Sequence, residues 1–397
     1  MQKEALRPRD FPFFDYSRYS FSLGVQVGDR VWLSGHSASR YDPAAGTIVV
    51  TGTMREQAAV SHAKQAAILA AAGMDFGNVV RVVDYMTPRG RDAYAELLEE
   101  RARIYGNHPP ATSAMVVDSL LRPDALIETE VTATREPAIR YGVGPGLGGV
   151  PRAAAVQVGP LLYTSAVLPL DENGRLVEGG LLEQTEQCFK NAQKILEAAG
   201  YSMAEVVKTI DYSHPSVRAE YGRTGRIRAT YLGEPGSVYL GATGILMSEL
   251  AVPGALIQIE FTACHGEKQP FNPGWDRYQK LTYYPATRVG DYLFLSGQAA
   301  LNPETNQIEH PGDIVAQARY TYANIRKTME AAGLTMDHIV KTIEYVTPAG
   351  LPDYRKTAAI RKEFFSEPFP AATGIVCAAL LRPEMLIEVD CWALATP

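Results

Sequence analysis

The chain repeats one stretch three times: VVRVVDYMTP at 79–88, VVKTIDYSHP at 206–215 and IVKTIEYVTP at 339–348. Each stretch follows an Ala-Ala-Gly sequence that is typical of a helix end. Each is followed, some forty residues later, by an apolar stretch with acidic residues: LIETEVTA, LIQIEFTA and LIEVDCWA. A repeat of this size is a whole small domain rather than a solenoid unit, so it predicts three tandem copies of one fold.

The composition bounds the class of protein. The chain has 397 residues, of which 46% are hydrophobic and 21% charged, as expected for a globular protein of two or three domains. The net charge of −6 argues against a nucleic-acid-binding face, because such faces are usually basic. No apolar run is long enough to span a membrane, and the first residues lack a signal-peptide core. The four cysteines show no metal-ligand spacing, so we expect free thiols and no metal. Free thiols are typical of a reducing compartment, so we expect a cytoplasmic location. We also expect no cofactor.

Gly- and Pro-rich stretches at 142–149 and 269–274 are typical of linkers and separate the copies. We therefore predict three domains, at 13–136, 150–267 and 278–397.

Each copy has the same predicted order of elements, β-β-α-β-α-β-β, which is an α+β layer with helices against one face of a sheet. A strand with apolar alternation opens the copy, and a short second strand is expected near 48–50 in copy one. A helix with apolar residues at helical spacing then ends at a glycine. The predicted opening strands are 30–34, 161–165 and 292–296; the first helices are 56–72, 183–199 and 315–332; the second helices are 94–105, 221–232 and 354–365.

Each copy resembles a subunit of the Rid (reactive intermediate deaminase, YjgF-type) family. The motifs that carry the resemblance are VGDRVWLSGH, VGPLLYTSAV and VGDYLFLSGQ, a helix containing Gln57, Gln184 or Gln317, and the strand ending LIEVD in copy three. Family members are small subunits with a chorismate-mutase-like fold that form homotrimers with ligand clefts between neighbouring subunits. The resemblance therefore implies a single-chain pseudo-trimer with three non-identical clefts.

The arginine with which family deaminases hold the substrate carboxylate is absent. A guanidinium offers a planar two-donor fork that suits a carboxylate. The positions that match it here are Thr112, Ala242 and Ala372. The departure predicts a substrate that differs from simple amino-acid imines, or clefts that only hold the trimer together.

A glutamate of the family positions the attacking water, and its counterparts are Glu128, Gln258 and Glu388. An amide cannot act as a base at neutral pH, so the three clefts are chemically unequal, and Glu128 and Glu388 are the candidate catalytic residues. The alternative is that they are surface residues of a strand. A second acid, two residues on, is kept in every copy as Glu130, Glu260 or Asp390.

Other cleft positions are candidate substrate-binding residues. A tyrosine that lines the family cleft matches Phe21, Arg152 and Tyr283, and Arg152 either supplies a positive charge or is a solvated linker arginine. His36 is either a proton carrier near pH 7 or a structural residue. Small residues after the missing arginine would let a ligand approach backbone amides. The remaining candidates are Ser34, Ser113, Ala114, Thr243, Gly244, Ser296, Thr373 and Gly374.

Two further positions of the repeat carry the same charge in all three copies: an acid on the repeated strand and an arginine on the second helix. We predict that each acid and arginine form a partly buried ion pair, or that the acids line the contact between copies. The columns are Asp84, Asp211 and Glu344, and Arg101, Arg228 and Arg361.

The leading functional hypothesis is a hydrolase that deaminates a small enamine or imine, or performs a related C–N hydrolysis, with Glu128 or Glu388 as base and backbone amides with Ser34 or Ser296 orienting the substrate. The alternatives are a non-catalytic binding or assembly protein, and a chorismate-cleaving enzyme, which would need several cationic groups in one cleft. RNA cleavage is disfavoured by the acidic balance. We expect a small-molecule substrate, no nucleic-acid or membrane partner, and a monomeric pseudo-trimer or a homo-oligomer of it.

Overall fold

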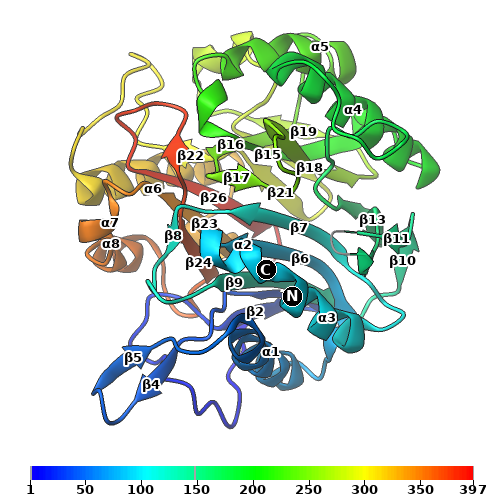
Figure 1. Ribbon diagram of the computed structural model, residues 1–397. Coiled ribbons are helices and arrows are strands. Elements are labelled where there is room, and N and C mark those ends of the chain that lie inside the picture. Colours follow the sequence, from blue (N-terminus) through cyan, green and yellow to red (C-terminus); the bar gives the residue numbers. More distant parts are fainter. Residues whose placement is uncertain (1, 147–148, 397) are drawn as a thin grey trace.

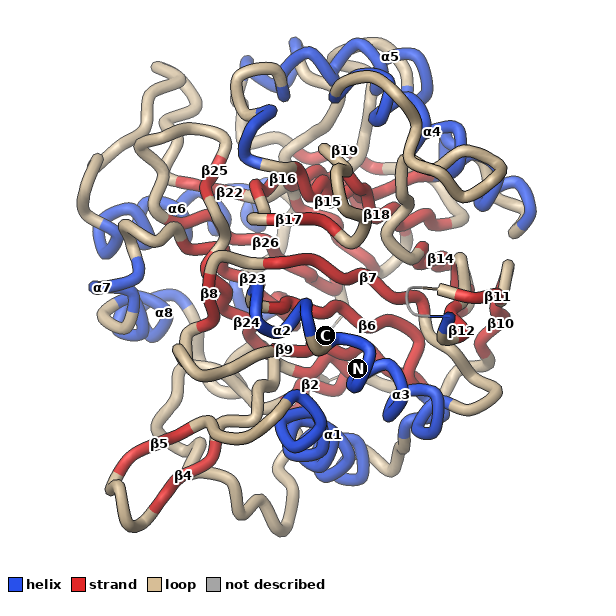
Figure 2. The backbone as a smooth tube through the Cα atoms, viewed as in Figure 1, coloured by secondary structure: helices blue, strands red, loops and turns tan. Residues whose placement is uncertain are grey.

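The computed structural model describes residues 2–146 and 149–396, in which the three copies fold into three similar α+β domains (Figure 1). Helices α1, α4, α5, α6 and α8 lie at the periphery, and the strands lie toward the middle (Figure 2). The first copy contains β1 (Lys3–Ala5), β2 (Gly24–Val27), β3 (Arg30–Leu33), β4 (Arg40–Asp42), β5 (Thr47–Val49), α1 (Met54–Ala71), β6 (Val79–Met86), α2 (Pro88–Asp92), α3 (Tyr94–Tyr105), β7 (Ala111–Val116), β8 (Ser119–Leu120) and β9 (Ile127–Thr134).

The second and third copies repeat this order with local differences. The second contains β10 (Ala138–Tyr141), β11 (Gly144–Pro145), β12 (Pro151–Arg152), β13 (Ala155–Val158), β14 (Leu161–Thr164), α4 (Leu181–Ala198), β15 (Val206–Ser213), α5 (Gly225–Leu232), β16 (Gly241–Leu246), β17 (Glu249–Leu250) and β18 (Ile257–Cys264). The third contains β19 (Gln269–Phe271), β20 (Ala286–Val289), β21 (Tyr292–Leu295), β22 (Gln298–Ala299), α6 (Ile314–Ala331), β23 (Ile339–Val346), α7 (Leu351–Tyr354), α8 (Thr357–Phe364), β24 (Ala371–Val376), β25 (Ala379–Leu380) and β26 (Ile387–Leu394).

The first domain shows the sheet topology of all three. Its strand order is β2-β3-β9-β6-β7, and the parallel pair β6 and β7 is connected through α2 and α3. The expected element order is found, with one strand missed: β2 precedes the predicted opening strand, β3, and forms a hairpin with it. The strand expected near 48–50 is present as β5, but it pairs with β4 in a separate two-stranded sheet.

The first helix of each copy begins at a defined cap. In α1, the Thr53 side chain accepts from the Glu56 amide and the Glu56 side chain accepts from the Thr53 amide, which forms a capping box. The glutamine common to the three helices has a structural role: its side-chain oxygen accepts a hydrogen bond from the backbone amide just before the last long strand. The three bonds join Gln57 to Leu126, Gln184 to Leu256 and Gln317 to Leu386.

The expected linkers contribute short strands. Residues 269–271 form β19, an edge strand that pairs with β20, and residues 144–145 pair with β12. Proline is tolerated on an edge strand because its missing N–H can face away from the ladder, so the Pro-rich composition of these segments did not exclude strands.

The domains exchange short strands in a cycle. Strand β17 of domain 2 pairs with β7 of domain 1, β8 of domain 1 pairs with β24 of domain 3, and β25 of domain 3 pairs with β16 of domain 2. Each sheet is therefore completed by a neighbour, and the three domains form one interlocked unit.

The repeated strands β6, β15 and β23 meet in a common core. All eight residues of each are buried, which explains their nearly continuous apolar sequence. Tyr85, Tyr212 and Tyr345, one from each strand, belong to a single hydrophobic cluster shared by the domains. The repeat that opened the sequence thus forms the centre of the molecule.

A cycle of buried ion pairs connects the domains around this core. The base comes from the third residue of each repeated strand, and the acid is the second acid of the last strand in the next domain. This accounts for an acid at that position in all copies. The pairs are Arg81–Glu260 at 2.5 Å, Lys208–Asp390 at 2.6 Å and Lys341–Glu130 at 3.0 Å.

Candidate active site

A serine after the first hairpin of each copy fixes one domain against its neighbour. Ser34 Oγ donates to the Ser22 carbonyl at 2.6 Å and accepts from the Ala372 amide of domain 3 at 2.8 Å. Ser165 and Ser296 make the same two bonds, with Thr112 and Ala242 as the neighbouring donors. These bonds confirm that Thr112, Ala242 and Ala372 are equivalent positions. They also leave the hydroxyl of Ser34 or Ser296 little capacity to orient a substrate.

Three clefts lie at these junctions, and we name each by the residue in the water-positioning column. The Glu128 cleft lies between domains 1 and 3, the Gln258 cleft between domains 2 and 1, and the Glu388 cleft between domains 3 and 2.

In the Glu128 cleft the carboxylate is buried and lies against Gly35 and Thr373. A Cβ added to Gly35 would collide with Glu128 Oε1 and lie 2.9 Å from the Thr373 methyl, so the glycine is needed for this close approach. Burial raises the pKa of Glu128 to about 7, while the Lys341 and Lys64 ammonium groups oppose the shift.

The Glu388 cleft repeats this arrangement around a cavity of about 580 Å³. A Cβ on Gly297 would lie 2.5 Å from Glu388 Oε1 and 3.0 Å from Thr243 Oγ1. Burial, reinforced by the Asp390 carboxylate, raises the pKa of Glu388 to about 8. Several predicted site residues line the same cavity: Ala242, Thr243, Gly244 and Tyr283.

Glu128 and Glu388 share a property that suits chemistry. Among the described residues, no amide or side chain donates a hydrogen bond to either carboxylate, although each is more than nine-tenths buried. A buried acid without a protein donor, and with a raised pKa, is a functional-site candidate.

The Gln258 cleft is different because both ends of its amide bond to the protein backbone. Gln258 Nε2 donates to the Ala114 carbonyl of domain 1, and Oε1 accepts from the Ala251 amide, both at 3.0 Å. The amide therefore joins domain 1 to domain 2, and an amide cannot act as a base at neutral pH. Arg152 and Ala114 line the cavity beside it.

Sequence reasoning missed one position of the repeat, at which an arginine is present only in the copies that keep the glutamate. Arg122 lies close enough to Glu128 to lower its pKa slightly, and Arg382 lines the Glu388 cavity, whereas Ala251 lines the Gln258 cleft. The signal was present in LLRPDALIE at 120–128 and LLRPEMLIE at 380–388 against LAVPGALIQ at 250–258. An arginine thus accompanies the carboxylate in the two clefts that keep it.

The predicted acid and arginine columns form buried ion pairs in all three domains, as expected. Asp84 pairs with Arg101, Asp211 with Arg228 and Glu344 with Arg361, and the acids are at most 2% exposed. In each domain a tyrosine also donates to the acid: Tyr94, Tyr221 and Tyr354. The Tyr221 and Tyr354 hydroxyls lie 2.5 Å from where a Cβ on Gly244 and Gly374 would be, so these pairs support the wall of the two glutamate clefts.

The other predicted residues have varied positions. His36 is buried, and burial together with the Lys64 ammonium lowers its pKa to about 3, which favours a neutral imidazole at pH 7 and the structural interpretation over the proton carrier. Ser113 Oγ accepts from the Ala166 amide, and Thr373 Oγ1 accepts from Lys341 and donates to Glu130, so both hydroxyls are used in domain contacts.

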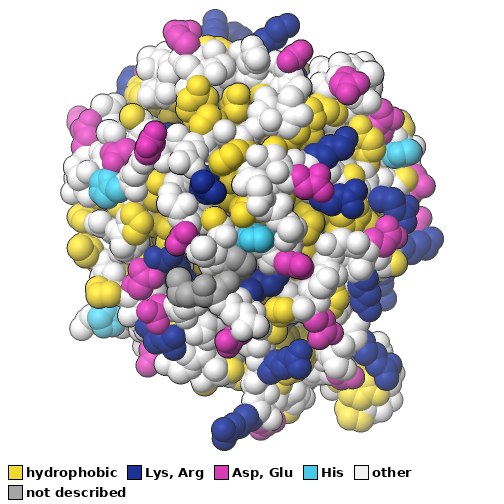
Figure 3. Space-filling view, turned by 180° about the vertical axis from the view of Figure 1, so that it is seen from behind, with side chains coloured by type: hydrophobic (Ala, Val, Ile, Leu, Met, Phe, Trp, Pro, Cys, Tyr) yellow, Lys and Arg dark blue, Asp and Glu magenta, His cyan; other side chains and the backbone are white. Residues whose placement is uncertain are grey.

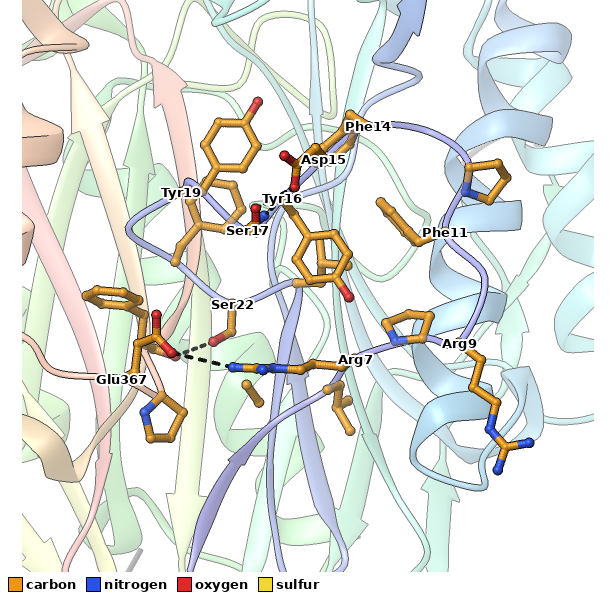
Figure 4. Close-up of a pocket in the computed structure, with 18 of the residues that line it drawn as sticks. Arg7, Arg9, Phe11, Phe14, Asp15, Tyr16, Ser17, Tyr19, Ser22 and Glu367 are labelled. Atoms are coloured by element: carbon orange, nitrogen blue, oxygen red, sulfur yellow. Dashed lines mark hydrogen bonds and ion pairs between the residues drawn. The ribbon is translucent and has the colours of Figure 1, made fainter.

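Phe21 lines a separate cavity of about 810 Å³ that the N-terminal segment forms against domain 3. Figure 4 shows Phe11, Phe14, Tyr16 and Tyr19 around this space, with Arg7 directed toward Glu367 at 3.5 Å. The aromatic position of the family cleft is therefore occupied in this copy by a residue stacked on Tyr19, at 5.0 Å between ring centroids.

Comparisons with known proteins decide the family. A family model described as Endoribonuclease L-PSP matches residues 16–135, 151–264 and 278–395. The chain belongs to this family. The three matches confirm the resemblance to the Rid (YjgF-type) family and the tandem arrangement of three α+β domains.

Two similar proteins each match about one copy of the repeat. A 2-iminobutanoate/2-iminopropanoate deaminase of Escherichia coli is 34% identical over 115 residues, which are 28% of this chain and 86% of that protein. A RutC family protein of Haemophilus influenzae is 37% identical over 134 residues, 33% of this chain and 94% of that protein. A crystal structure of a chorismatase superposes with a TM-score of 0.54 at 15% identity, covering 80% of this chain and 93% of that one, which shows a shared fold.

The surface gives two further observations. None of the described helices is both long and apolar enough to cross a membrane. On the face in Figure 3, Lys and Arg side chains are interspersed with Asp and Glu side chains.

Proposed function

We propose that the chain is a hydrolase that adds water to the C=N bond of a small anionic imine, or of the imine form of an enamine, in the Glu388 and Glu128 clefts. The observation that carries the proposal is the pair of buried glutamates, each at a domain junction and without a hydrogen-bond donor among the described residues. Membership of a family that includes imine deaminases supports the reaction class.

The chemistry needs one proton carrier. The ionised glutamate takes a proton from water as the water oxygen attacks the imine carbon, and it returns that proton to the imine nitrogen. The resulting carbinolamine collapses when the hydroxyl proton reaches nitrogen through the same carboxylate, which releases ammonia and a carbonyl product. A pKa of about 7 for Glu128 and about 8 for Glu388 lets one group both accept and donate near neutral pH.

Arg382 and Arg122 are proposed to hold the substrate carboxylate in place of the missing family arginine. The Arg382 guanidinium is itself positioned by two bonds to Asn306, at 2.8 and 2.9 Å. A fixed guanidinium fork can bind a carboxylate with two hydrogen bonds. These arginines lie at a different position in the fold from the family arginine, so they would hold the substrate carboxylate from another direction. The accepted substrate should therefore differ in shape from that of the single-domain relatives.

A second candidate is hydrolysis of a dianionic enol ether such as chorismate. It is favoured by the charge of the Glu388 cavity, which is lined by Arg226, Arg277, Lys280 and Arg382 in addition to the paired Arg228, against the acids Glu234 and Glu388. This is more positive charge than one carboxylate requires, and it meets the need for several cationic groups in one cleft. Release of pyruvate from chorismate would favour this candidate over imine hydrolysis.

The test is ammonia release from 2-imino acids generated in situ, compared for the wild type, Glu128→Gln, Glu388→Gln and the double variant. We expect each single variant to keep part of the activity and the double variant to lose roughly a hundredfold or more. Glu304→Gln, at an exposed turn, is the matched control and should leave activity unchanged. Turnover that survives in the double variant would contradict the assignment. Binding of small carboxylates without turnover in the wild type would favour the binding-protein alternative.

A further inference from the structure

A tyrosine of domain 2 lies in the same cavity as the glutamate of domain 3. Tyr221, Gly244 and Glu388 all line the Glu388 cavity. Burial raises the pKa of Tyr221, and the Tyr283 hydroxyl and the Glu388 carboxylate add to the shift. The Tyr221 hydroxyl is therefore protonated at neutral pH and lies within electrostatic range of the carboxylate.

The proton of this hydroxyl is already used. Tyr221 Oη donates to Asp211 Oδ2 at 2.9 Å, and Arg228 pairs with the same carboxylate oxygen. A hydroxyl has one proton and two lone pairs, so the phenol oxygen is left to accept hydrogen bonds from a molecule in the cavity. The buried ion pair thus holds Tyr221 as an acceptor.

Tyr354 repeats this arrangement in the Glu128 cleft. Its hydroxyl donates to Glu344, which also pairs with Arg361. Burial and the Glu344 carboxylate raise the pKa of Tyr354, and the Glu128 carboxylate adds to the shift. This tyrosine is therefore also protonated, held as an acceptor and within electrostatic range of a cleft glutamate.

The residue beside each hydroxyl changes together with the glutamate. Opposite the acid of the repeated strand, the parallel strand carries Gly244 and Gly374 in the two glutamate clefts but Ala114 in the Gln258 cleft. The Tyr221 and Tyr354 hydroxyls each lie 2.5 Å from the place that a Cβ on the glycine would take. The glycine leaves this side of the hydroxyl open, and alanine replaces it where glutamine replaces the glutamate.

We infer that Tyr221 and Tyr354 are water-positioning residues, which accept one hydrogen bond from the attacking water while the cleft glutamate accepts the other. With both of its O–H bonds directed in this way, the water has a lone pair left to attack the imine carbon. One water proton moves to the carboxylate and the C=N electron pair moves to nitrogen, so the phenol neither gains nor loses a proton. The inference rests on the proposed imine hydrolysis and adds a second protein group to it.

The experiment measures kcat and KM for 2-imino acids in the Glu128→Gln variant, in which the Glu388 cleft keeps its base. Tyr221→Phe in this background should lower kcat roughly tenfold to a hundredfold and change KM by less than about twofold, because the lost contact is to water and not to substrate. Tyr94→Phe is the matched control. It removes the same kind of bond, to Asp84 at 2.7 Å, in the cleft without a glutamate, and should leave kcat unchanged.

Gly244→Ala is a second test that keeps the tyrosine. Its methyl group should cover the phenol oxygen and lower kcat to a similar extent. Alanine is compatible with the fold at this position, because in domain 1 Tyr94 keeps its bond to Asp84 while Ala114 occupies the equivalent place. Tyr354→Phe and Gly374→Ala in the Glu388→Gln background repeat both tests in the other glutamate cleft.

Two results would overturn the inference: an unchanged kcat in Tyr221→Phe, or an equal loss of kcat in Tyr94→Phe, which would reveal a structural effect common to the domains. Urea unfolding should show similar losses of stability in these two variants, so that kcat alone separates them. Absence of turnover in both Glu128→Gln and Glu388→Gln parents, with the wild type inactive as well, would instead refute the proposed hydrolysis and this role with it.

Discussion

Replacing Lys208 by Met should destabilise the protein strongly and in a pH-dependent way. Lys208 Nζ lies 2.6 Å from Asp390 Oδ1 and 2.6 Å from the Leu295 carbonyl, and both side chains are at most 1% exposed. Removing one partner of a buried ion pair costs about 3–5 kcal/mol because the other charge is left unpaired. We therefore expect the variant to lose that much free energy of unfolding at pH 8, measured by urea denaturation.

The sign of the pH dependence follows from Asp390. Burial already raises its pKa in the folded protein, and loss of the ammonium group would raise it further. Between the unfolded value of about 4 and the raised folded value, the folded state binds the extra proton, so stability falls as the pH rises by up to about 1.4 kcal/mol per pH unit. The deficit of the variant should consequently shrink at pH 5, where Asp390 becomes protonated and neutral.

A double-mutant cycle with Asp390→Asn distinguishes the ion pair from simple loss of packing. The double variant has no unpaired charge, so its deficit should be smaller than that of Lys208→Met and nearly independent of pH. A Lys208→Met deficit below about 1 kcal/mol, a deficit equal at pH 5 and pH 8, or additive effects in the cycle would each refute the reasoning.

Three further outcomes follow from the clefts and the domain cores. Arg228→Met and Asp211→Asn should show a coupling energy of about 1–3 kcal/mol in urea denaturation, and additivity would exclude the pairing. Gly297→Ala should reduce turnover in the Glu388 cleft about a hundredfold because its Cβ would displace the carboxylate, whereas Gly144→Ala, outside this cavity and with open space around it, should not. In a pH profile, kcat/KM should rise and level off above the Glu388 pKa of about 8, since the base must be ionised; a falling limb in that range would indicate an acid role instead.

Sequence comparison within the chain predicted the fold well because scaffold residues repeat. The first helices were predicted to within two residues, and the buried strands were found from their apolar runs. Strand β2 was missed because GVQV is short and lies beside a turn. The hairpin of β4 and β5 was read as part of the sheet instead, although it forms a sheet of its own, and the equivalent segments of copies two and three form only single antiparallel bridges, Leu170–Leu176 and Leu301–Ile308. Short edge strands depend on a partner strand, which local sequence does not specify.

The candidate site was predicted less completely, for a physical reason. The glutamates could be found because they belong to a repeated strand, but burial decides their pKa and burial depends on a neighbouring domain. His36 shows the same limit, since its neutral state follows from burial near Lys64. Arg122 and Arg382 could have been found, because they change together with the glutamates along the three copies.

The cyclic exchange of short strands also has a consequence for biosynthesis. Domain 1 leaves the ribosome first, but the free edge of β7 must wait for β17, and β8 has no partner until β24 of the last domain has been made. Exposed strand edges are prone to pair with other chains, so the nascent protein passes through a long interval in which its first domain is open to aggregation. Only translation of the final copy closes the ring, so the N-terminal third of the chain keeps an unpaired strand until the C-terminal third has been made.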